Sequence, residues 1–411
     1  MKRLSFLLLL FLVGNGCAFF DPFPGLGRSR EEVMGGGRGH SPKDTPDPGS
    51  DTTAHLYLCA VEYPKGYDWV KDTAYSTVQA SLRLFRDGEC IVSVPTGGAY
   101  QISTDPDTHW ILDGHLITTF TDGSRTWVKR DGADLLCFDG AEDIKGLLLK
   151  DGILWTLGQK LRGQGFSLRA DGTSVSENAQ GTLIGTLYED DGALCFAYGM
   201  TTKNGSYTIR RYLVSADGVE KEVPVPSDAV AVYDIRRRGG ITYATYLQRG
   251  NLTRPVISTD SENNQLLTSG TNTDHPEWCE ILPIGESDVS VKGLLVFKSG
   301  SRRYQLWSRT GILIVYTSNT LIHDFYADEK GNIAAVGYDE TAAETVLFLP
   351  PSGRSRVGLG RKYRFITSRA ACLADGKFHA GLTGEEGDLL WSDGRTAEMQ
   401  INGPVTGLAY Q

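Results

Sequence analysis

Short apolar segments separated by tight-turn residues recur along the chain from about residue 53 to the C-terminus. Many segments are apolar at consecutive positions, as in Leu294–Phe297, which is typical of strands whose two sheet faces are both covered. Between the segments lie pairs such as Asp87-Gly88, because Asp and Gly accept the positive φ angles that two-residue hairpin turns require. The pattern therefore predicts an all-β chain built from hairpins.

Two turn signals alternate at a regular period in this part of the chain. The first follows a short apolar strand and recurs about every 44 residues, the period of a four-stranded propeller blade. Its Gly-equivalent positions are Gly88, Gly132, Gly172, Gly218, Ser261, Gly311, Gly353 and Gly394. The second comes one hairpin earlier in each unit, as at Asp113-Gly114, so each unit is expected to contain four strands, A to D. The repeat predicts a β-propeller with eight blades, and seven blades is the alternative count.

The first unit lacks a strand A, because a Pro- and Gly-rich segment directly precedes its strand B. Residues 404–411 follow the last D strand instead, and they resemble the strand A segments at 183–188 and 321–326. We expect this C-terminal strand to complete the first blade. Such closure removes the open sheet edges that would otherwise pair with other chains.

The N-terminus has the features of an export signal. Lys2 and Arg3 precede the apolar run Leu4–Val13, which is too short to span a bilayer. Cys17 follows residues 13–16, and this stretch resembles the bacterial lipobox, which implies removal of residues 1–16 and diacylation of Cys17. The stretch departs from that pattern where Gly14 replaces a large aliphatic residue. Cleavage without lipidation, which would give a secreted protein, is the alternative.

Residues 17–52 are rich in Pro and Gly and contain few apolar residues, so they are expected to form a disordered tether before a propeller at 53–411. The whole arrangement has a general resemblance to β-propeller lipoproteins of Bacteroidetes-like bacteria. The resemblance implies a lipoprotein of the cell envelope, in the outer membrane and facing either the periplasm or the surface. Contact with the membrane would then be made by the lipid anchor only. The resemblance implies no activity.

Charge and cysteine usage narrow the classes of partner. The chain has 41 Lys and Arg against 50 Asp and Glu, a net charge of -9, which argues against nucleic acid as a partner. Six cysteines remain after Cys17, scattered without a Cys-x-x-Cys pair, so we expect small buried residues and no metal site. No nucleotide or dinucleotide motif occurs, so no cofactor is expected. The chain is expected to be a monomer.

The loops between strands B and C carry many cations in the middle units. We expect Arg125, Arg162, Arg249 and Arg302 to form a basic arc that attracts an anionic polymer such as a polysaccharide. The matching loops of the seventh and eighth units are acidic instead, as at Asp339. The alternative is that these charges are ordinary solvated hairpin tips.

Two connections between strands D and A place a tryptophan beside carboxylates. Trp110 and Trp278 are therefore candidates for stacking on a sugar ring near the mouth of the tunnel, and the alternative is that they fill gaps between blades. The aromatic-rich insertion at 63–75 could form a lid or a partner contact. Its alternative is a loop packed over the rim.

No residue pair stands out as catalytic, and no nucleophile or metalloprotease motif occurs. We therefore expect a propeller that binds a glycan or an envelope protein through its loops and catalyses no reaction. The alternative is a carbohydrate-active enzyme, a glycoside hydrolase or lyase whose carboxylates come from different blades and meet at the tunnel mouth. A scaffold within an envelope complex is a third possibility.

Overall fold

The computed structural model describes most of the chain after residue 53. The described residues are 54–71, 78–97, 101–161, 165–201, 209–215, 220–223, 225–226, 229–259, 265–267, 273–285, 288–297, 302–309, 311–314, 319–384 and 387–411. The expected signal, Cys17 and the tether lie outside them. In the described part, none of the helices has the length and apolar character needed to cross a membrane. That part contains strands and two short 3-10 helices, η3 (Pro106–Thr108) and η4 (Ser368–Ala370).

The strands form four-stranded antiparallel sheets, which we number 1 to 8 along the chain. Sheet 1 contains β32 (Val405–Tyr410), β1 (Leu56–Glu62), β2 (Ser81–Arg86) and β3 (Glu89–Pro95). Sheet 2 contains β4 (His109–Leu112), β5 (His115–Thr121), β6 (Arg125–Arg130) and β7 (Ala133–Asp139). Sheet 3 contains β8 (Glu142–Lys150), β9 (Ile153–Lys160), β10 (Phe166–Ala170) and β11 (Thr173–Asn178). Sheet 4 contains β12 (Gly181–Asp190), β13 (Ala193–Thr201), β14 (Ile209–Ser215) and β15 (Glu220–Glu222).

The other four sheets repeat this plan. Sheet 5 contains β16 (Ala229–Arg238), β17 (Ile241–Gln248), β18 (Asn251–Thr259) and β19 (Gln265–Leu266). Sheet 6 contains β20 (Thr273–Ile284), β21 (Asp288–Phe297), β22 (Arg302–Ser308) and β23 (Gly311–Ile314). Sheet 7 contains β24 (Thr320–Ala327), β25 (Ile333–Asp339), β26 (Glu344–Leu349) and β27 (Ser355–Gly358). Sheet 8 contains β28 (Ala371–Ala374), β29 (Lys377–Leu382), β30 (Asp388–Ser392) and β31 (Arg395–Met399).

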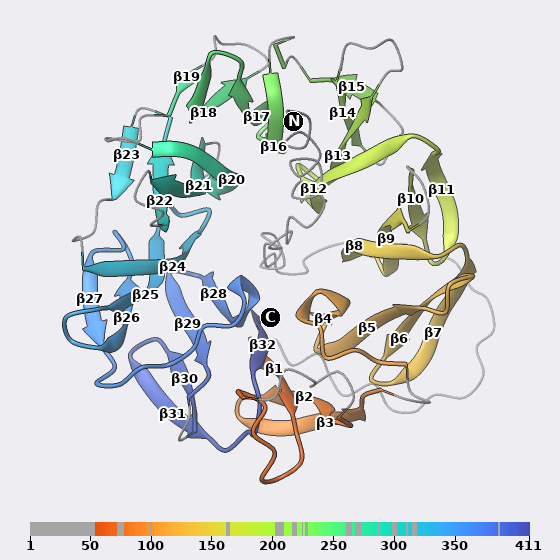
Figure 1. The fold of residues 1–411 in the computed structure, drawn as a ribbon. Coiled ribbons are helices and arrows are strands. Elements are labelled where there is room, and N and C mark those ends of the chain that lie inside the picture. The colour runs from red at the N-terminus through yellow and green to blue at the C-terminus, as the bar shows by residue number, and fades with distance from the viewer. Residues whose placement is uncertain are drawn as a thin grey trace, which may run out of the picture.

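The sheets follow one another around a central axis, as the blades of a propeller do (Figure 1). In each sheet the first strand named above lies nearest the axis, and the other three follow outward in order. An all-β propeller is therefore the architecture of the described chain, as the sequence predicted.

The C-terminal strand β32 occupies the innermost position of sheet 1. It pairs antiparallel with β1 from Leu56 opposite Tyr410 to Ala60 opposite Val405. Backbone hydrogen bonds extend the pairing, with His55 N donating to Gln411 O at 2.6 Å and Val61 N donating to Pro404 O at 2.9 Å. The first and last parts of the chain therefore share one sheet, which is the closure that the sequence predicted.

The Asp-Gly pairs form tight turns because both residues adopt left-handed backbone angles. Eight aspartates in these turns have φ between 45° and 53°, and the following glycines are positive as well. In three sheets the carboxylate also ties the turn to strand B. The Oδ1 atoms of Asp87, Asp131 and Asp171 accept the N–H of the first or second residue of that strand at 2.9 to 3.0 Å.

The hydrophobic core lies between neighbouring sheets and has no single centre. Between sheets 3 and 4, Phe166, Phe196 and Tyr198 form an aromatic group, with the rings of Phe166 and Tyr198 4.6 Å apart. A Cβ on Gly181 would lie 2.7 Å from the Phe166 ring, so a glycine is needed where the sheets approach. Each such buried side chain stabilises the fold by about 1.5–3 kcal/mol.

The six cysteines of the described chain differ in their exposure. Cys59, Cys195 and Cys279 are buried between strands, as expected from the apolar segments that contain them. Cys90 and Cys137 are exposed, because they lie on the outermost strands β3 and β7, where one sheet face meets solvent. The prediction of burial is therefore wrong for these two residues.

Candidate functional site

The antiparallel order of each sheet puts its connections at two opposite ends. Connections from the second to the third strand, and from one sheet to the next, lie at the same end, which we call the loop face. The Asp-Gly turns between the first and second strands, and between the third and fourth, lie at the other end, which we call the turn face. Any ligand site on the loop face therefore combines residues from two kinds of loop.

Two of the four predicted arginines can be placed as exposed side chains on the loop face. Arg125 opens β6, and its Nε lies 3.4 Å from Asp139 Oδ1. Arg249 is exposed in the turn between β17 and β18. Arg302 begins β22 at the same face, and its side chain is outside the described part. Arg162 and Cys17 are also outside it, so their roles stay predictions.

The turn that carries Arg125 is organised by Asp122. The Asp122 carboxylate accepts the N–H groups of Ser124 and Arg125 at 2.9 and 2.8 Å. These hydrogen bonds lower the pKa of Asp122 to about 2, and the bond from Ser124 N–H makes the largest contribution, before that from Arg125 N–H. The carboxylate is thus a fixed anion beside Arg125, and it reduces the positive potential at this loop tip.

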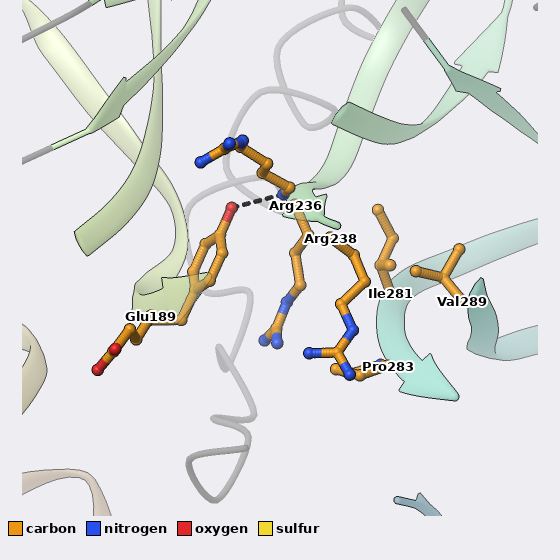
Figure 2. Close-up of a pocket in the computed structure, with 8 residues that line it drawn as sticks. Glu189, Arg236, Arg238, Ile281, Pro283 and Val289 are labelled. Atoms are coloured by element: carbon orange, nitrogen blue, oxygen red, sulfur yellow. Dashed lines mark hydrogen bonds between the residues drawn. The ribbon is translucent and has the colours of Figure 1, made fainter. Parts of the chain in front are cut away.

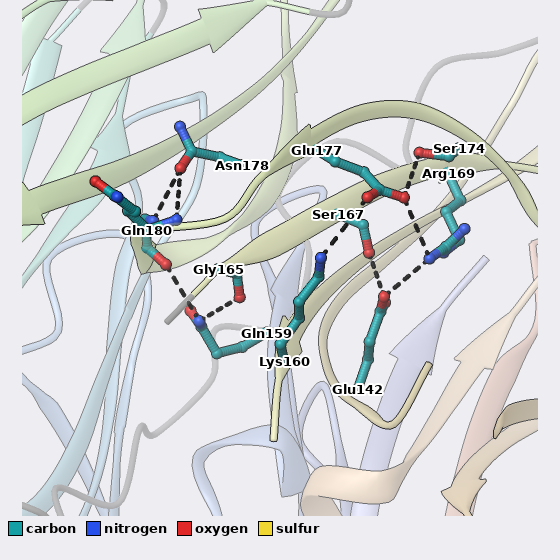
Figure 3. Close-up of polar contacts among 11 residues, drawn as sticks. Glu142, Gln159, Lys160, Gly165, Ser167, Arg169, Ser174, Glu177, Asn178 and Gln180 are labelled. Atoms are coloured by element: carbon teal, nitrogen blue, oxygen red, sulfur yellow. Dashed lines mark hydrogen bonds and ion pairs between the residues drawn. The ribbon is translucent and has the colours of Figure 1, made fainter. Parts of the chain in front are cut away.

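Local carboxylates also compensate the charges at two other loop tips. Lys160 Nζ lies 3.6 Å from Glu177 Oε2, and Glu177 also contacts Arg169 (Figure 3). In sheet 7, Arg356 Nη2 lies 2.7 Å from Asp339 Oδ2. The contrast in charge between the basic loops of the middle units and the acidic loops of the seventh and eighth units is therefore weaker in the structure than in the sequence.

Arg169, which contacts Glu177, also takes part in a buried group of polar contacts within sheet 3. Glu142 Oε1 accepts a hydrogen bond from Ser167 Oγ at 2.5 Å and one from Arg169 Nη2 at 2.9 Å (Figure 3). A Cβ on Gly158 would lie 2.3 Å from Glu142 Oε2, so this carboxylate sits directly on the backbone of β9. The arrangement joins three strands of one sheet, which is a structural role.

Trp110 is buried and lies within β4, not in the preceding loop. It is 5% exposed and packs with Leu112 and Leu147 between sheets 2 and 3. The Arg369 guanidinium lies 5.3 Å from the centre of the indole ring, as in a cation–π contact. Little of the ring is left for a sugar to stack on, so the placement corresponds to the alternative, a residue that fills the gap between blades.

Arg369 is part of a buried cluster where sheets 8, 2 and 1 meet. Its Nη1 donates to Pro106 O at 2.5 Å and its Nη2 donates to His109 O. Burial lowers the pKa of Arg369 to about 10 and that of His109 to about 3. His109 Nε2 lies 2.8 Å from Oγ1 of Thr406 on the closing strand. The cluster therefore ties the closing strand to its neighbours.

Trp278 also lies inside a strand, because β20 begins five residues earlier, at Thr273. Two β-bulges, one on each side of Pro276, let the strand pairing continue past this proline. Its ring is half-buried and meets Tyr304 edge to face, with centroids 5.7 Å apart. Trp110 and Trp278 belong to sheets 2 and 6, so the structure does not bring them into one site.

The described part of the aromatic insertion, residues 63–71, packs against sheet 1. Tyr63 is 5% exposed, and its ring stacks on Trp69 with centroids 6.4 Å apart. The side-chain amide of Asn402 donates to the carbonyl oxygen of Pro64 at 2.8 Å. These contacts correspond to the packed-loop alternative, and residues 72–77 lie outside the described part.

The connection from sheet 7 to sheet 8 presents a cationic and aromatic surface that the sequence interpretation missed. Residues 359–370 cross the loop face from the outermost strand β27 to η4. Their backbone is held on both sides, since Thr345 N donates to Arg361 O at 2.9 Å and Arg364 N donates to Thr383 O at 2.7 Å. Tyr363 points inward and is 4% exposed. Lys362 and Arg364 on either side of it are exposed.

Apolar groups adjoin these cations. Lys362 Nζ lies 5.1 Å from the centre of the Tyr338 ring, and Tyr338 is paired with Leu321, which is 41% exposed. Phe365 stacks on His323 with centroids 6.4 Å apart. Burial, and then the charge of Lys362, lower the pKa of His323, so its imidazole is neutral at pH 7. We call this surface the sheet 7–8 patch, and it comprises Leu321, His323, Tyr338, Lys362, Arg364 and Phe365.

A sequence signal for the patch existed. Lys362 to Phe365 alternate cations and aromatic rings within the connection from the seventh unit to the eighth.

The architecture defines this chain as a β-propeller, and comparison with known proteins adds no family. No family model and no curated protein matches the sequence. A solved puromycin hydrolase is 12% identical, with a TM-score of 0.45 over 76% of this chain and 55% of that one. The acylaminoacyl peptidase of Pyrococcus horikoshii is 12% identical, with a TM-score of 0.45 over 83% of this chain and 57% of that one. A Dyadobacter fermentans protein of unknown function is 13% identical, with a TM-score of 0.34 over 70% and 91%.

Proposed function

We propose that this chain is an exported, lipid-anchored propeller of eight blades, one for each four-stranded sheet, that binds an acidic glycan through its loop face. The observation that carries the proposal is the sheet 7–8 patch, in which Lys362 and Arg364 are exposed beside half-buried rings on a backbone held by two sheets. A site whose backbone is already ordered loses little conformational entropy when a ligand binds.

The chemistry of the patch suits a sugar that bears carboxylate or sulfate groups. The apolar faces of sugar rings pack on aromatic and aliphatic side chains, here Tyr338, Phe365 and Leu321, while anionic substituents pair with Lys362 and Arg364. The chain has a net charge of -9, so a local group of cations determines where an anionic polymer can approach.

Binding to a set of neutral, carboxylated and sulfated polysaccharides tests the proposal. We expect the mature chain to bind at least one acidic polymer, and the double variant Lys362→Glu, Arg364→Glu to lose that binding. The matched control is the double variant Arg125→Glu, Arg249→Glu, which reverses two charges elsewhere on the loop face and should retain most of it. If the control loses binding and the patch variant keeps it, the basic arc is the site and the patch is not.

The same samples separate the other functions. Shortening of the polymer, followed by its mass, would indicate a carbohydrate-active enzyme and would contradict a purely binding role. A different result would indicate a protein partner. In that case no polysaccharide binds, and an envelope protein co-purifies with the natural chain but not with the patch variant.

Export and lipidation rest on the N-terminal sequence. Residues 1–16 would be removed, Cys17 would carry the lipid and residues 17–52 would form the tether. In a bacterial host that processes lipoproteins, we expect the chain in the membrane fraction and the Cys17→Ser variant outside it. Equal distribution of the two forms would contradict lipidation.

A further inference from the structure

β-bulges in the innermost strands leave single residues without a partner in the neighbouring strand. In β8, β16, β20, β24 and β32 these residues are Lys145, Tyr233, Glu277, His323 and Thr406. A bulge turns its side chain out of the regular alternation along the strand, and bulges are frequent next to functional sites. The contacts of each bulged side chain therefore indicate whether it stabilises the ring or is available to a ligand.

Three of these side chains have partners that explain them. The Tyr233 hydroxyl donates to Pro276 O in sheet 6 at 2.8 Å. Thr406 Oγ1 lies 2.8 Å from Nε2 of His109 in sheet 2. Lys145 forms an ion pair with a carboxylate of its own strand. These contacts hold strands in place, so the three residues have a structural role.

His323 has no such explanation. Its imidazole stacks on Phe365, with centroids 6.4 Å apart, and neither ring nitrogen forms a hydrogen bond or an ion pair within the part of the chain that the structure describes. The side chain is half-buried, and its nitrogens are not enclosed. The ring is thus held in one orientation by stacking, while its polar atoms are open to a ligand.

His323 lies at the axial end of the sheet 7–8 patch, because β24 is the innermost strand of sheet 7 (Figure 1). Lys362 is close enough for its charge to act on the imidazole. An anionic group held beside Lys362 therefore acts on the same imidazole with the opposite sign.

Lys362 has no carboxylate partner among the described residues, in contrast to cations elsewhere in the ring. At the turn-face end of β16, beside the hollow shown in Figure 2, Arg237 Nε lies 3.6 Å from Asp190 Oδ2 and Arg238 Nη1 lies 3.0 Å from Glu329 Oε1. Lys362 contacts only the Tyr338 ring in the described part. Its positive charge is therefore available to an anionic ligand.

The elements around His323 carry other titratable or charged side chains, namely Asp324, Glu277, Tyr338, Cys372, Arg361 and Arg364. Asp324 is already paired with Lys292 at 3.0 Å, and burial raises the pKa of the Cys372 thiol to about 12. In this set the imidazole alone has an ordinary pKa close to 6. A change in ligand affinity near pH 6 that originates in the patch is therefore assigned to His323.

We propose that His323 is a further ligand-binding residue of the sheet 7–8 patch, and that an anionic group bound by Lys362 and His323 is taken up together with a proton on the imidazole. The proton comes from the buffer. This inference rests on the glycan proposal, because it adds a third polar contact to the same site. Burial, and then the charge of Lys362, keep the imidazole neutral at pH 7, so the bound state gains a proton and binding becomes stronger as the pH falls.

Titration calorimetry of the mature chain with dextran sulfate, whose sulfate esters stay ionised between pH 5 and 8, tests the coupling. At pH 6, in buffers that differ in ionisation enthalpy, we expect proton uptake on binding by the natural chain and none by His323→Asn. Between pH 7.5 and 5.5 the affinity of the natural chain should rise by about two- to fivefold more than that of the variant, as for one partly exposed charge contact. The comparison with the variant is needed because the whole chain becomes less acidic as the pH falls.

Two further variants make the result specific. His115→Asn is the matched control, because it removes a histidine on the turn face, and it should keep the proton uptake of the natural chain. His323→Arg supplies a permanent cation, so it should bind more tightly than the natural chain at pH 7.5 and take up no proton. If only a carboxylated polymer binds, polygalacturonate replaces dextran sulfate in the same measurement above pH 5.

The outcomes separate this inference from the glycan proposal. Binding without proton uptake, with the same pH dependence in the natural chain and His323→Asn, would overturn the role of His323 and leave the patch as the glycan site. Failure of every acidic polymer to bind at any pH would overturn both proposals.

Discussion

Asp388 should make the stability of this propeller fall as the pH rises through neutrality. Asp388 opens β30 at the loop face and is 1% exposed. Its Oδ1 accepts the N–H of Gly384 at 3.1 Å, and its Oδ2 is buried without a hydrogen-bond partner among the described residues. Burial raises the pKa of this carboxyl from 3.8 to about 7, because the charged form loses its hydration.

The sign and size of the effect follow from the shift. A carboxyl that binds its proton more tightly in the folded state stabilises the fold fully below its unfolded pKa of 3.8, and this contribution is lost as the pH rises through 7. One pKa unit corresponds to about 1.4 kcal/mol, so the shift amounts to about 4 kcal/mol as an upper value. That is a large part of the 5–15 kcal/mol by which most domains are stable.

Urea unfolding of the natural chain and of Asp388→Asn, at several pH values between 4 and 8.5, measures this directly. Asn keeps an oxygen for Gly384 N–H and cannot ionise, so the variant should gain stability relative to the natural chain as the pH rises. A difference that does not change with pH would refute the reasoning.

Asp339→Asn should show the opposite dependence of stability on pH, because N–H groups of Ala342 and Thr341 and the charge of Arg356 lower the pKa of Asp339. The stabilisation by Asp339 is lost as the pH falls below about 4.

Three further predictions concern the ring and its packing, and urea or thermal unfolding checks each one. Leu408→Ala on the closing strand, where Leu408 is 3% exposed, should cost about 2–5 kcal/mol, and a cost below about 1 kcal/mol would contradict a close-packed closure. Gly158→Ala should cost about 1–3 kcal/mol, because the new Cβ would lie 2.3 Å from Glu142 Oε2, whose carboxylate Ser167 and Arg169 hold in place. Arg369→Lys should cost about 2–4 kcal/mol, because an ammonium cannot reach Pro106 O and His109 O together as the guanidinium does. An unchanged melting temperature would show that Arg369 does not stabilise the closure.

The repeat and the closure could be predicted from the sequence because they depend on local chemistry. Asp131-Gly132 must turn tightly, since both residues accept positive φ at little cost and most other pairs do not. The closing strand was predicted from a missing strand at one end of the repeat and an extra one at the other. Neither inference needed knowledge of which residues meet across sheets.

The candidate site depends on such long-range contacts, so much of it could not be predicted. Bulges beside Pro276 extend β20 backward, which moves Trp278 from an expected loop into a strand. The potential at Arg125 depends on Asp139, fourteen residues away and opposite it in the strand register. Charge summed along a single loop therefore misjudges the charge that a ligand meets on the surface.

The ion pairs of the ring differ in whether they join two sheets or stay within one, and this determines which charges can be changed without loosening the ring. On the turn face four ion pairs join different sheets, Lys150–Glu189, Arg237–Asp190, Arg238–Glu329 and Lys330–Asp375. Others at this face, such as Lys129–Asp134 and Arg309–Asp288, stay within one sheet. On the loop face, three pairs stay within one sheet: Arg125–Asp139, Lys160–Glu177 and Arg356–Asp339. The three loop-face pairs can therefore be lost without loosening contacts between sheets, whereas loss of the four pairs that join different sheets would loosen them. A binding surface that varies with its ligand is therefore compatible with these three loop-face positions.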